Sequence, residues 1–550
     1  MQLSRRDMLK IGGLGAVGAA GLTLPFRGEV SAKSASELPD SRMPRPFRNA
    51  FIRQPVATPY KKGEDASGRP MHYYDISAKT GTANIVSGLA TPVLGYNGVV
   101  PGPRIDVDQG TKIVMQLRNK LPATHPTFGT PLKISTHLHG SASLPQYDGY
   151  ASDVTPAGQT KWYHYPNFQG ARTLWYHDHG VHYTAQNAYS GLAAQYHMHD
   201  PAERDLLPQG DYDVAVTLSD IAFKANASQL YDDRSQSSLY GDVILVNGVA
   251  WPVMKVKKKI YRFRFLNASI SRSYRPSTSP AAPMYVVGMD GGLAPKAQQV
   301  SNWRHGNAER YEVLIDFRGF KAGTKINLNN LSNPNNRDFD NTNKIMQFDV
   351  VEDNALPADS PGSKTISSIP NALVNSDVMK LKQTPGMKVR TLRVERTNGL
   401  WAINGETWED IVKSGYKKVL GNPGLGDTEV WNIQNKSGGW FHPVHIHLVD
   451  FKILSRNGKP AFAYEQGPKD VAYVGENETV KVIMKFGDKN APVQNTGKYM
   501  VHCHNLVHED HDMMHQFSVG LKDGDVDPND PITAAPCGND GEDDKYPGAW

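Results

Sequence analysis

Tyr261-Arg262-Phe263-Arg264-Phe265 places an aromatic side chain at every second position, with an arginine between each pair. The same alternation of apolar and polar residues occurs in Lys112-Ile113-Val114-Met115-Gln116-Leu117 and in Val480-Lys481-Val482-Ile483-Met484. A period of two indicates β-strands with one buried face and one face in water, as is usual in antiparallel sheets. Such runs, separated by Gly, Pro and Asn, continue from about residue 50 onward, and long helical patterns are scarce. The sequence therefore predicts an all-β protein built of successive β-sandwiches.

The composition of the 550 residues is typical of a folded, loop-rich protein, with 39% hydrophobic and 21% charged residues, 50 Gly and 37 Pro. At roughly 100–200 residues per domain, this length predicts several domains. The formal net charge is +5. Such a weak charge does not indicate nucleic acid binding.

Changes in composition along the chain mark the expected domain boundaries. Asp200-Pro201-Ala202-Glu203 ends a first unit, and residues 353–384 are rich in Pro, Ser and Asp. We expect β-sandwich domains at 45–205, 206–355 and 385–522, a linker at 356–384 and a tail at 523–550. The tail is strongly acidic, so we expect it to be solvated and disordered.

The first 32 residues resemble an export signal. Ser4-Arg5-Arg6-Asp7-Met8-Leu9-Lys10 precedes a Gly- and Ala-rich apolar run from Ile11 to Leu24, and Val30-Ser31-Ala32 fits a cleavage site. A twin-arginine pair before such a run marks export of folded cargo. The alternative is a retained membrane anchor, which the glycines of the run, such as Gly12, Gly13, Gly15 and Gly18, disfavour because they make it weakly apolar. We therefore expect the twin-arginine translocase as a partner during export, a mature protein in the periplasm or outside the cell, and no stable membrane span.

Ten of the 19 histidines fall in four compact clusters. They are His137 and His139; His177 and His179; His442, His445 and His447; and His502, His504 and His508. On a strand, residues i and i+2 share one face, so each pair with this spacing presents two imidazoles side by side. Cys503, one of only two cysteines, lies between His502 and His504 and faces the opposite way. One short segment can therefore serve two metal sites, a role that disfavours a disulfide between Cys503 and Cys537.

The ligand types indicate copper. A thiolate, two imidazoles and a weak axial thioether form the blue-copper ligand set, and Cys503, His442, His508 and Met513 supply it. The other eight histidines suit an imidazole-only site, which copper binds tightly. Zinc is the alternative metal, but a structural zinc site closes with four ligands and leaves the additional histidines unexplained.

The four clusters, in this order, resemble those of the multicopper oxidases. Thr173-Leu174-Trp175-Tyr176-His177-Asp178-His179 and the segment from His502 to Asp510 are similar to the bilirubin oxidase and spore-coat laccase branch. Leu245-Val246-Asn247-Gly248, Tyr261-Arg262-Phe263-Arg264 and Trp440-Phe441-His442-Pro443 match as well, so the likeness spans residues 44–521. The resemblance implies three consecutive cupredoxin-like Greek-key domains and four copper ions.

The resemblance also implies a role for each ligand. Cys503, His442 and His508 would bind the type 1 copper, with Met513 as the axial ligand. The type 2 ion would be bound by His137 and His445. The type 3 pair would be bound by His139, His177, His179, His447, His502 and His504. Met514 competes with Met513 for the axial role, but the ten-residue separation of Met513 from Cys503 matches the family.

Several residues near these motifs have a plain structural interpretation. His197 and His199 repeat the i, i+2 spacing, but no further ligand lies beside them in the sequence. His182, His511 and His515 lie near the clusters, and Trp440 lies two residues before His442. Each of them is explained as an ordinary core or surface side chain, or as a neighbour of the metal ligands.

Reduction of O₂ to water requires four electrons and four protons, whereas a blue-copper site accepts one electron at a time. Cys503 is covalently flanked by His502 and His504, so the backbone provides a short electron path between two sites. Asp148 and Glu509 match positions where the family has acidic groups near the trinuclear site. Either carboxylate is a candidate proton relay, or else an ordinary loop carboxylate.

The expected activity is oxidation of phenols, aromatic amines or bilirubin-like tetrapyrroles coupled to reduction of O₂. An axial Met predicts a moderate type 1 potential. The first alternative is a metallo-oxidase of Cu(I), Fe(II) or Mn(II), which the thin spread of 16 Met disfavours for Cu(I). The second is a non-catalytic envelope cupredoxin protein, and a two-domain nitrite reductase fits the length and ligand clusters less well.

Overall fold

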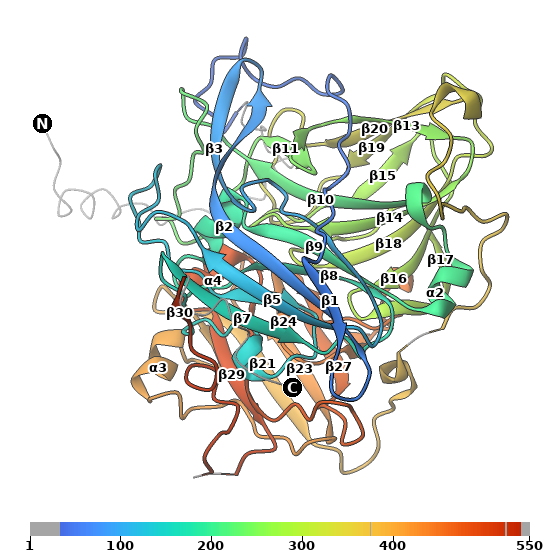
Figure 1. Cartoon of the computed structure of the whole chain (residues 1–550). Coiled ribbons are helices and arrows are strands. Elements are labelled where there is room, and N and C mark those ends of the chain that lie inside the picture. The colour runs from blue at the N-terminus through green and yellow to red at the C-terminus, as the bar shows by residue number, and fades with distance from the viewer. Residues whose placement is uncertain (1–33, 375, 523–524, 541–550) are drawn as a thin grey trace, which may run out of the picture.

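The computed structural model describes residues 34–374, 376–522 and 525–540. The predicted export signal at 1–32 lies outside these residues. Strands account for 41% and helices for 8%, which confirms the all-β prediction. Six sheets form three successive two-sheet units, coloured blue to cyan, green to yellow, and orange to red in Figure 1. Among the described residues, no helix has both the length and the apolar character needed to cross a membrane.

The first unit pairs a six-stranded sheet with a four-stranded one. The larger sheet contains β1 (Lys61–Glu64), β2 (Pro70–Val86), β3 (Leu89–Tyr96), β5 (Lys112–Asn119), β7 (Gln159–Tyr165) and β30 (Gly538–Asn539). The smaller sheet has the order β4 (Ile105–Asp108), β9 (Ala193–His199), β8 (Arg172–Asp178) and β6 (Thr136–His139). Aromatic and aliphatic side chains from both sheets form the core between them.

The second unit contains a seven-stranded sheet and a four-stranded sheet. The order in the first is β12 (Val249–Ala250), β11 (Val243–Val246), β10 (Asp213–Ile221), β14 (Ile260–Asn267), β18 (Arg310–Asp316), β16 (Met284–Met289) and β17 (Gly292–Val300). The order in the second is β13 (Val253–Lys257), β20 (Lys344–Val351), β19 (Lys325–Asn330) and β15 (Pro276–Ser279).

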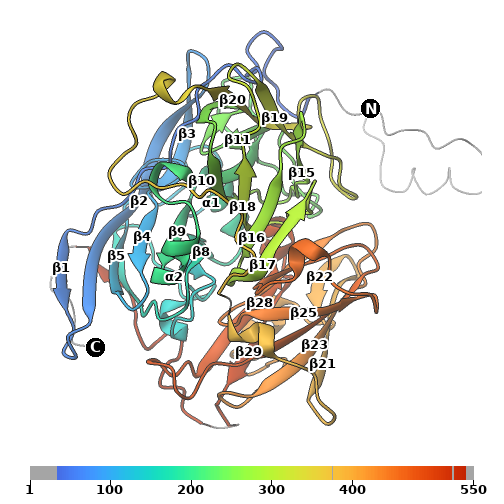
Figure 2. The same cartoon turned by 90° about the vertical axis from the view of Figure 1, so that its right-hand side faces the viewer.

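The third unit packs below the other two in Figure 2 and repeats the two-sheet plan. The order in its five-stranded sheet is β22 (Leu400–Ile403), β21 (Val389–Thr397), β23 (Thr428–Asn435), β27 (Thr479–Lys485) and β25 (Phe451–Arg456). The order in its four-stranded sheet is β26 (Val471–Val474), β24 (His442–Ile446), β28 (Gly497–Cys503) and β29 (Met514–Val519). The α-helices are short: α1 (Thr184–Ser190), α2 (Pro201–Leu206), α3 (Trp408–Lys413) and α4 (Leu506–Asp510).

The strands differ from the sequence expectation in two respects. Five of the six sheets contain a parallel pair, for example β10 with β14 and β4 with β9, because neighbouring strands are connected across the sandwich. The predicted wet face is also wrong for β14 and β5. Arg262 and Arg264 of β14 are fully buried, because the first unit covers their face and its Glu203 pairs with both guanidinium groups.

The prediction of a disordered tail is wrong for residues 525–540. Gly538 and Asn539 pair with Thr160 and Gln159 of β7, so the chain end adds a short strand to the first unit. The buried ammonium of Lys161 donates to the carbonyl oxygen of Ala535 at 2.6 Å, and Arg118 forms an ion pair with Asp540. Basic side chains of the first unit therefore provide the counter-charge that the acidic composition alone did not reveal.

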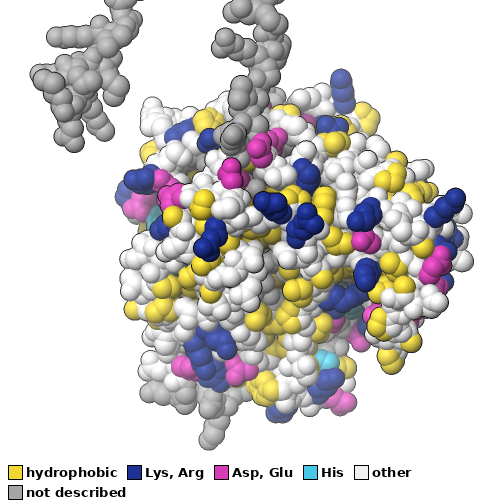
Figure 3. All heavy atoms as spheres, turned by 90° about the horizontal axis from the view of Figure 1, so that it is seen from above, with side chains coloured by type: hydrophobic (Ala, Val, Ile, Leu, Met, Phe, Trp, Pro, Cys, Tyr) yellow, Lys and Arg dark blue, Asp and Glu magenta, His cyan; other side chains and the backbone are white. Residues whose placement is uncertain are grey.

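The face shown in Figure 3 carries Lys and Arg side chains interspersed with Asp and Glu. This mixture agrees with the small net charge of the chain.

Candidate metal centre

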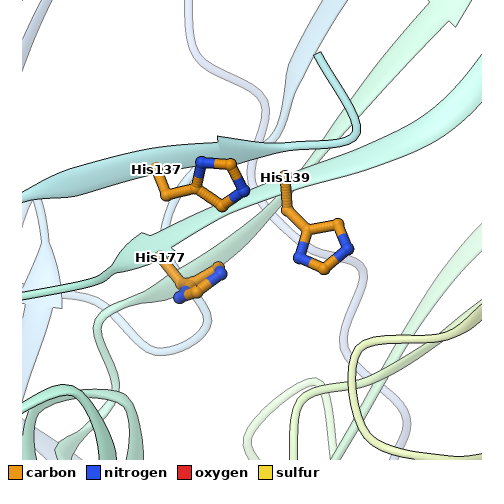
Figure 4. A group of neighbouring side chains, drawn as sticks. All are labelled: His137, His139 and His177. Atoms are coloured by element: carbon orange, nitrogen blue, oxygen red, sulfur yellow. The ribbon is translucent and has the colours of Figure 1, made fainter. Parts of the chain in front are cut away.

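The histidine clusters meet where the first and third units face each other. His137 and His139 lie on β6, and His177 lies opposite His137 on β8. His445 lies opposite His502 in the pairing of β24 with β28. In Figure 4, His137 and His139 project from the same side of β6, and His177 comes from the strand beside it. Every one of these imidazoles is buried.

Hydrogen bonds orient two of the rings toward each other. The Nδ1 atoms of His137 and His445 donate to the backbone carbonyls of Asp148 (2.5 Å) and Asp470 (2.9 Å). The protons are therefore on Nδ1, and the Nε2 atoms keep their lone pairs. These two Nε2 atoms lie 3.4 Å apart. Because neither carries a proton, they cannot hydrogen-bond to each other, and only a cation could accept both lone pairs. We call this the paired-histidine group.

A second set, the first three-histidine group, consists of His179, His447 and His502. The Nε2 atom of His502 lies 3.1 Å from Nε2 of His179 and 3.2 Å from Nε2 of His447. Nδ1 of His447 lies 2.7 Å from Asp148 Oδ2, and Nδ1 of His502 lies 2.7 Å from Glu509 Oε2. Asp148 and Glu509 therefore hold the outer nitrogens of two rings whose inner nitrogens converge.

His139, His177 and His504 form the second three-histidine group. The ring centroids lie 5.1–5.9 Å apart. His139 Nε2 lies 3.0 Å from Asp470 Oδ1, and His177 Nδ1 lies 2.8 Å from the carbonyl of Asp178. The opposite ring nitrogens of both, and both nitrogens of His504, are buried without a hydrogen-bond partner. Orphaned buried nitrogens of this kind are costly unless a ligand satisfies them.

The cysteine group, Cys503 with His442 and His508, lies inside the core of the third unit. Nδ1 of His442 and of His508 lie 3.2 and 3.7 Å from the Cys503 sulfur. Their Nε2 atoms are engaged by Ser437 Oγ and by the carbonyl of Ser237, so both Nδ1 atoms face the sulfur with lone pairs.

The two methionines lie in different places. Met513 packs in the same core cluster as Cys503, whereas Met514 packs in a separate cluster with Tyr150 and Trp408. Backbone hydrogen bonds also tie Met513 to the group, since its amide donates to the carbonyl of His508 and its carbonyl accepts from the amide of Cys503. The position of Met513 is thus compatible with an axial ligand.

Burial controls the protonation of these groups. It lowers the pKa of His177 and His442 to about 3 and of His179 to about 4, so the imidazoles are neutral and free to bind metal. Burial also raises the pKa of the Cys503 thiol, so the thiolate requires a cation beside it. The donors therefore fit copper: neutral imidazoles, one sulfur, and unpaired nitrogens directed inward.

The carboxylates differ from one another. Burial raises the pKa of Asp148 well above its ordinary value. Burial by itself raises the pKa of Glu509. The nearby imidazoles of His502 and His179 have the larger, opposite effect, so the pKa of Glu509 is lowered overall. Asp470 was missed by sequence reasoning, because its contact with His139 joins residues 331 positions apart.

Comparison with known proteins places the chain in a family. A family model described as "Multicopper oxidase" matches residues 77–203, and a second with the same description matches residues 381–523. Bilirubin oxidase of Albifimbria verrucaria is 38% identical over 471 residues, which cover 82% of this chain and 77% of that protein. The chain belongs to the multicopper oxidase family.

Other relatives agree with this placement. The laccase of Bacillus subtilis strain 168 is 30% identical over 505 residues, covering 81% of this chain and 94% of the laccase. The crystal structure of the McoA multicopper oxidase of Aquifex aeolicus superposes with a TM-score of 0.73 at 26% identity, covering 87% of this chain and all of that one. The predicted cupredoxin-like fold is confirmed, and this multicopper oxidase is an enzyme that uses copper to couple oxidation of a reducing substrate to reduction of O₂.

Proposed function

We propose that the four groups bind four copper ions. The cysteine group with Met513 would hold a type 1 ion, the paired-histidine group a type 2 ion, and the two three-histidine groups a type 3 pair. The observation that carries this proposal is the direction of the ring nitrogens: hydrogen bonds occupy the outer nitrogens of His137, His445 and His177, while the inner nitrogens converge without a donor.

Copper ions, when bound, supply one-electron transfer and the reduction of O₂ to water. The chain connects the groups through Cys503, whose sulfur lies in the cysteine group while the adjoining residues His502 and His504 belong to the two three-histidine groups. The path from the sulfur to either imidazole therefore runs through covalent bonds of neighbouring residues.

Asp148 and Glu509 would carry protons to the same place. Each is buried within 2.7 Å of a ring nitrogen of a proposed ligand, so each both orients an imidazole and holds an acceptor oxygen beside it. A carboxylate in this position can accept and release protons without moving the ligands.

Aromatic donors fit the outer side of the cysteine group. The His508 ring lies 4.0 Å from the Trp401 ring, and Trp440 meets Trp401 edge-on at 5.1 Å. The Arg396 guanidinium covers both indoles at 4.9 and 5.4 Å, and Trp440 is half-buried. A phenol, an aromatic amine or a bilirubin-like tetrapyrrole would contact the accessible part of Trp440, and an anionic group would pair with Arg396.

We further propose that the twin-arginine signal exports the folded chain to the periplasm or beyond. Replacing Arg5 and Arg6 together by Lys would retain the protein in the cytoplasm, as fractionation would show, and unchanged export would contradict the proposal.

The test of the copper proposal combines spectroscopy with catalysis. The visible spectrum of the copper-loaded protein should show intense blue absorbance, and about two of the four copper ions should be detectable by EPR. Oxygen uptake should follow addition of a phenol, an aromatic amine or bilirubin more readily than addition of Cu(I), Fe(II) or Mn(II). Faster uptake with a metal ion would support a metallo-oxidase instead, and a colourless, inactive protein would support a non-catalytic cupredoxin protein.

A further inference from the structure

A second set of metal-ligating side chains lies on the smaller sheet of the first unit, away from the four copper groups. His197 and His199 are neighbours on one face of β9, and Asp106 on the edge strand β4 lies opposite His197 in the parallel pairing. One ligand atom from each of the three residues lies within 4.8 Å of the other two. Asp106 could not be recognised as a third ligand from sequence spacing, because it lies 91 residues before His197 in the chain.

The tautomer of His197 follows from the glutamine beside it. Gln195 donates its amide nitrogen to the carbonyl oxygen of Arg264 at 3.2 Å, so its Oε1 atom faces His197 Nε2 at 2.7 Å. His197 must therefore carry its proton on Nε2, and Nδ1 keeps a lone pair. That Nδ1 lies 3.7 Å from Asp106 Oδ1, so two acceptors face each other with no proton between them.

His199 has a matching arrangement. Its Nδ1 lies 3.1 Å from Glu203 Oε2, a carboxylate held in place by Arg262 and Arg264. Donation from Nδ1 leaves the lone pair of His199 on Nε2. Burial, with the nearby charges of Arg264 and Arg104, lowers the pKa of His197 well below its usual value. The imidazole of His197 is thus available in the neutral form that binds metal.

Asp106 remains able to bind although it already has a partner. Arg104 donates to Oδ1 at 2.6 Å and to Oδ2 at 2.7 Å. A carboxylate has about four lone-pair sites, so a bidentate guanidinium leaves room for a further cation. The Asp106 side chain is 32% exposed, which opens the set to solution and to water ligands.

The charged side chains around these three residues leave a net negative charge, which favours a bound cation. Asp106, Glu203, Asp213 and Glu312 contribute four negative charges, against three positive charges from Arg104, Arg262 and Arg264, which are paired with them. Before any ion binds, this end of the sheet therefore carries one net negative charge.

We propose that Asp106, His197 and His199 bind a divalent first-row transition-metal ion of the zinc class. Two imidazoles and one carboxylate suit such ions, and metal–ligand bonds of about 2.0–2.2 Å would draw the three ligands closer together around it. The site is separate from the copper groups: Thr173 of β8 lies opposite His197, and His177 is four residues further along that strand, or about 13 Å at roughly 3.3 Å per residue.

The test uses the full chain with its copper groups loaded, so that Zn²⁺ serves as a probe for the remaining site. Zinc titration followed by gel filtration and elemental analysis should give one Zn²⁺ per chain without loss of copper or of blue absorbance. Asp106→Asn should weaken zinc binding at least tenfold. His197→Gln should do the same, and full retention of the bound copper, whose proposed histidine ligands come from both the first and the third unit, would show that both units remain folded.

Asp108→Asn is the matched control, because it removes the same charge two residues further along β4 from a carboxylate outside the set. It should retain the zinc. Absence of bound zinc in the unmodified chain would overturn the proposal, and so would equal zinc binding by Asp106→Asn and Asp108→Asn. X-ray absorption of the bound Zn²⁺ should report nitrogen and oxygen neighbours, and sulfur neighbours would place the ion at Cys503 or Cys537 instead.

Discussion

Buried polar side chains lie at two ends of the smaller sheet of the first unit, and their partners differ between the two ends. At one end, β6 and β8 present histidines whose inward nitrogens have no hydrogen-bond partner. At the other end, Arg262 and Arg264 of the second unit meet Glu203, Asp213 and Glu312 in a network of ion pairs. Both regions are fully buried interfaces between units. The difference indicates that the first is built for ions from outside the chain, whereas the guanidinium groups of the second are paired with carboxylates of the chain itself.

The largest expected effect concerns the ion-pair end. Glu203→Gln removes a carboxylate that both Arg262 and Arg264 contact, so two buried guanidinium groups lose compensation. We expect the free energy of unfolding of the metal-free protein to fall by about 3–5 kcal/mol, measured by denaturant titration. Asp205→Asn on the exposed side of the same helix is the control, and we expect a change within about 0.5 kcal/mol. Similar losses in both variants would remove the distinction between the two ends.

At the histidine end, the corresponding carboxylate should affect catalysis rather than stability. Glu509→Gln retains a polar side chain beside His502 but cannot take up a proton, so oxygen reduction should slow by about 10²–10⁴-fold while the blue absorbance stays. The measurement is steady-state oxygen uptake alongside the visible spectrum. Glu409→Gln, on helix α3, should leave both unchanged. Unchanged turnover in Glu509→Gln would remove Glu509 from proton transfer.

Removing buried nitrogens that have no hydrogen-bond partner should raise the free energy of unfolding of the metal-free protein, whereas Glu203→Gln should lower it. His504→Leu eliminates two buried nitrogens that have no partner, so the metal-free protein should gain about 1–2 kcal/mol while its copper content falls. His125→Leu is the contrast, because Ser190 and two backbone amides satisfy both nitrogens of that buried ring. This variant should lose stability. A loss in both variants would show that His504 is stabilising without metal.

The free energy of unfolding should depend on pH over a different range at each of the two ends. The pKa of His177 is lowered to about 3 in the folded chain, so its stabilising contribution is complete above about pH 6.5 and is lost as the pH falls, because only the unfolded chain takes up the proton. The pKa of Glu203 is lowered as well, so its contribution is lost only below about pH 4.5.

His177→Leu should therefore reduce the slope of unfolding free energy against pH between about 6 and 4 by up to one proton, about 1.4 kcal/mol per pH unit. Denaturant titrations of the metal-free protein across this range measure the slope. Identical slopes for the variant and the unmodified chain would mean that His177 is protonated in the folded state.

Sequence reasoning identified the β-fold and brought the histidine clusters together because both depend on local spacing. The i, i+2 pairs and the His-Cys-His segment need only strand geometry to be interpreted. The buried arginine face of β14 was not predictable, since alternation does not say which unit covers a polar face. Asp470 and Asp106 were missed for a related reason: each meets its histidine through pairing or packing of distant segments.

The most direct test of the electron path is the substitution Cys503→Ser in the copper-loaded protein. We expect loss of the blue absorbance, three rather than four bound copper ions, and donor-driven oxygen uptake at background, while the chemically reduced variant still consumes O₂ when exposed to it once. A Cys503→Ser protein that remains blue and oxidises donors at the original rate would rule out electron transfer through Cys503.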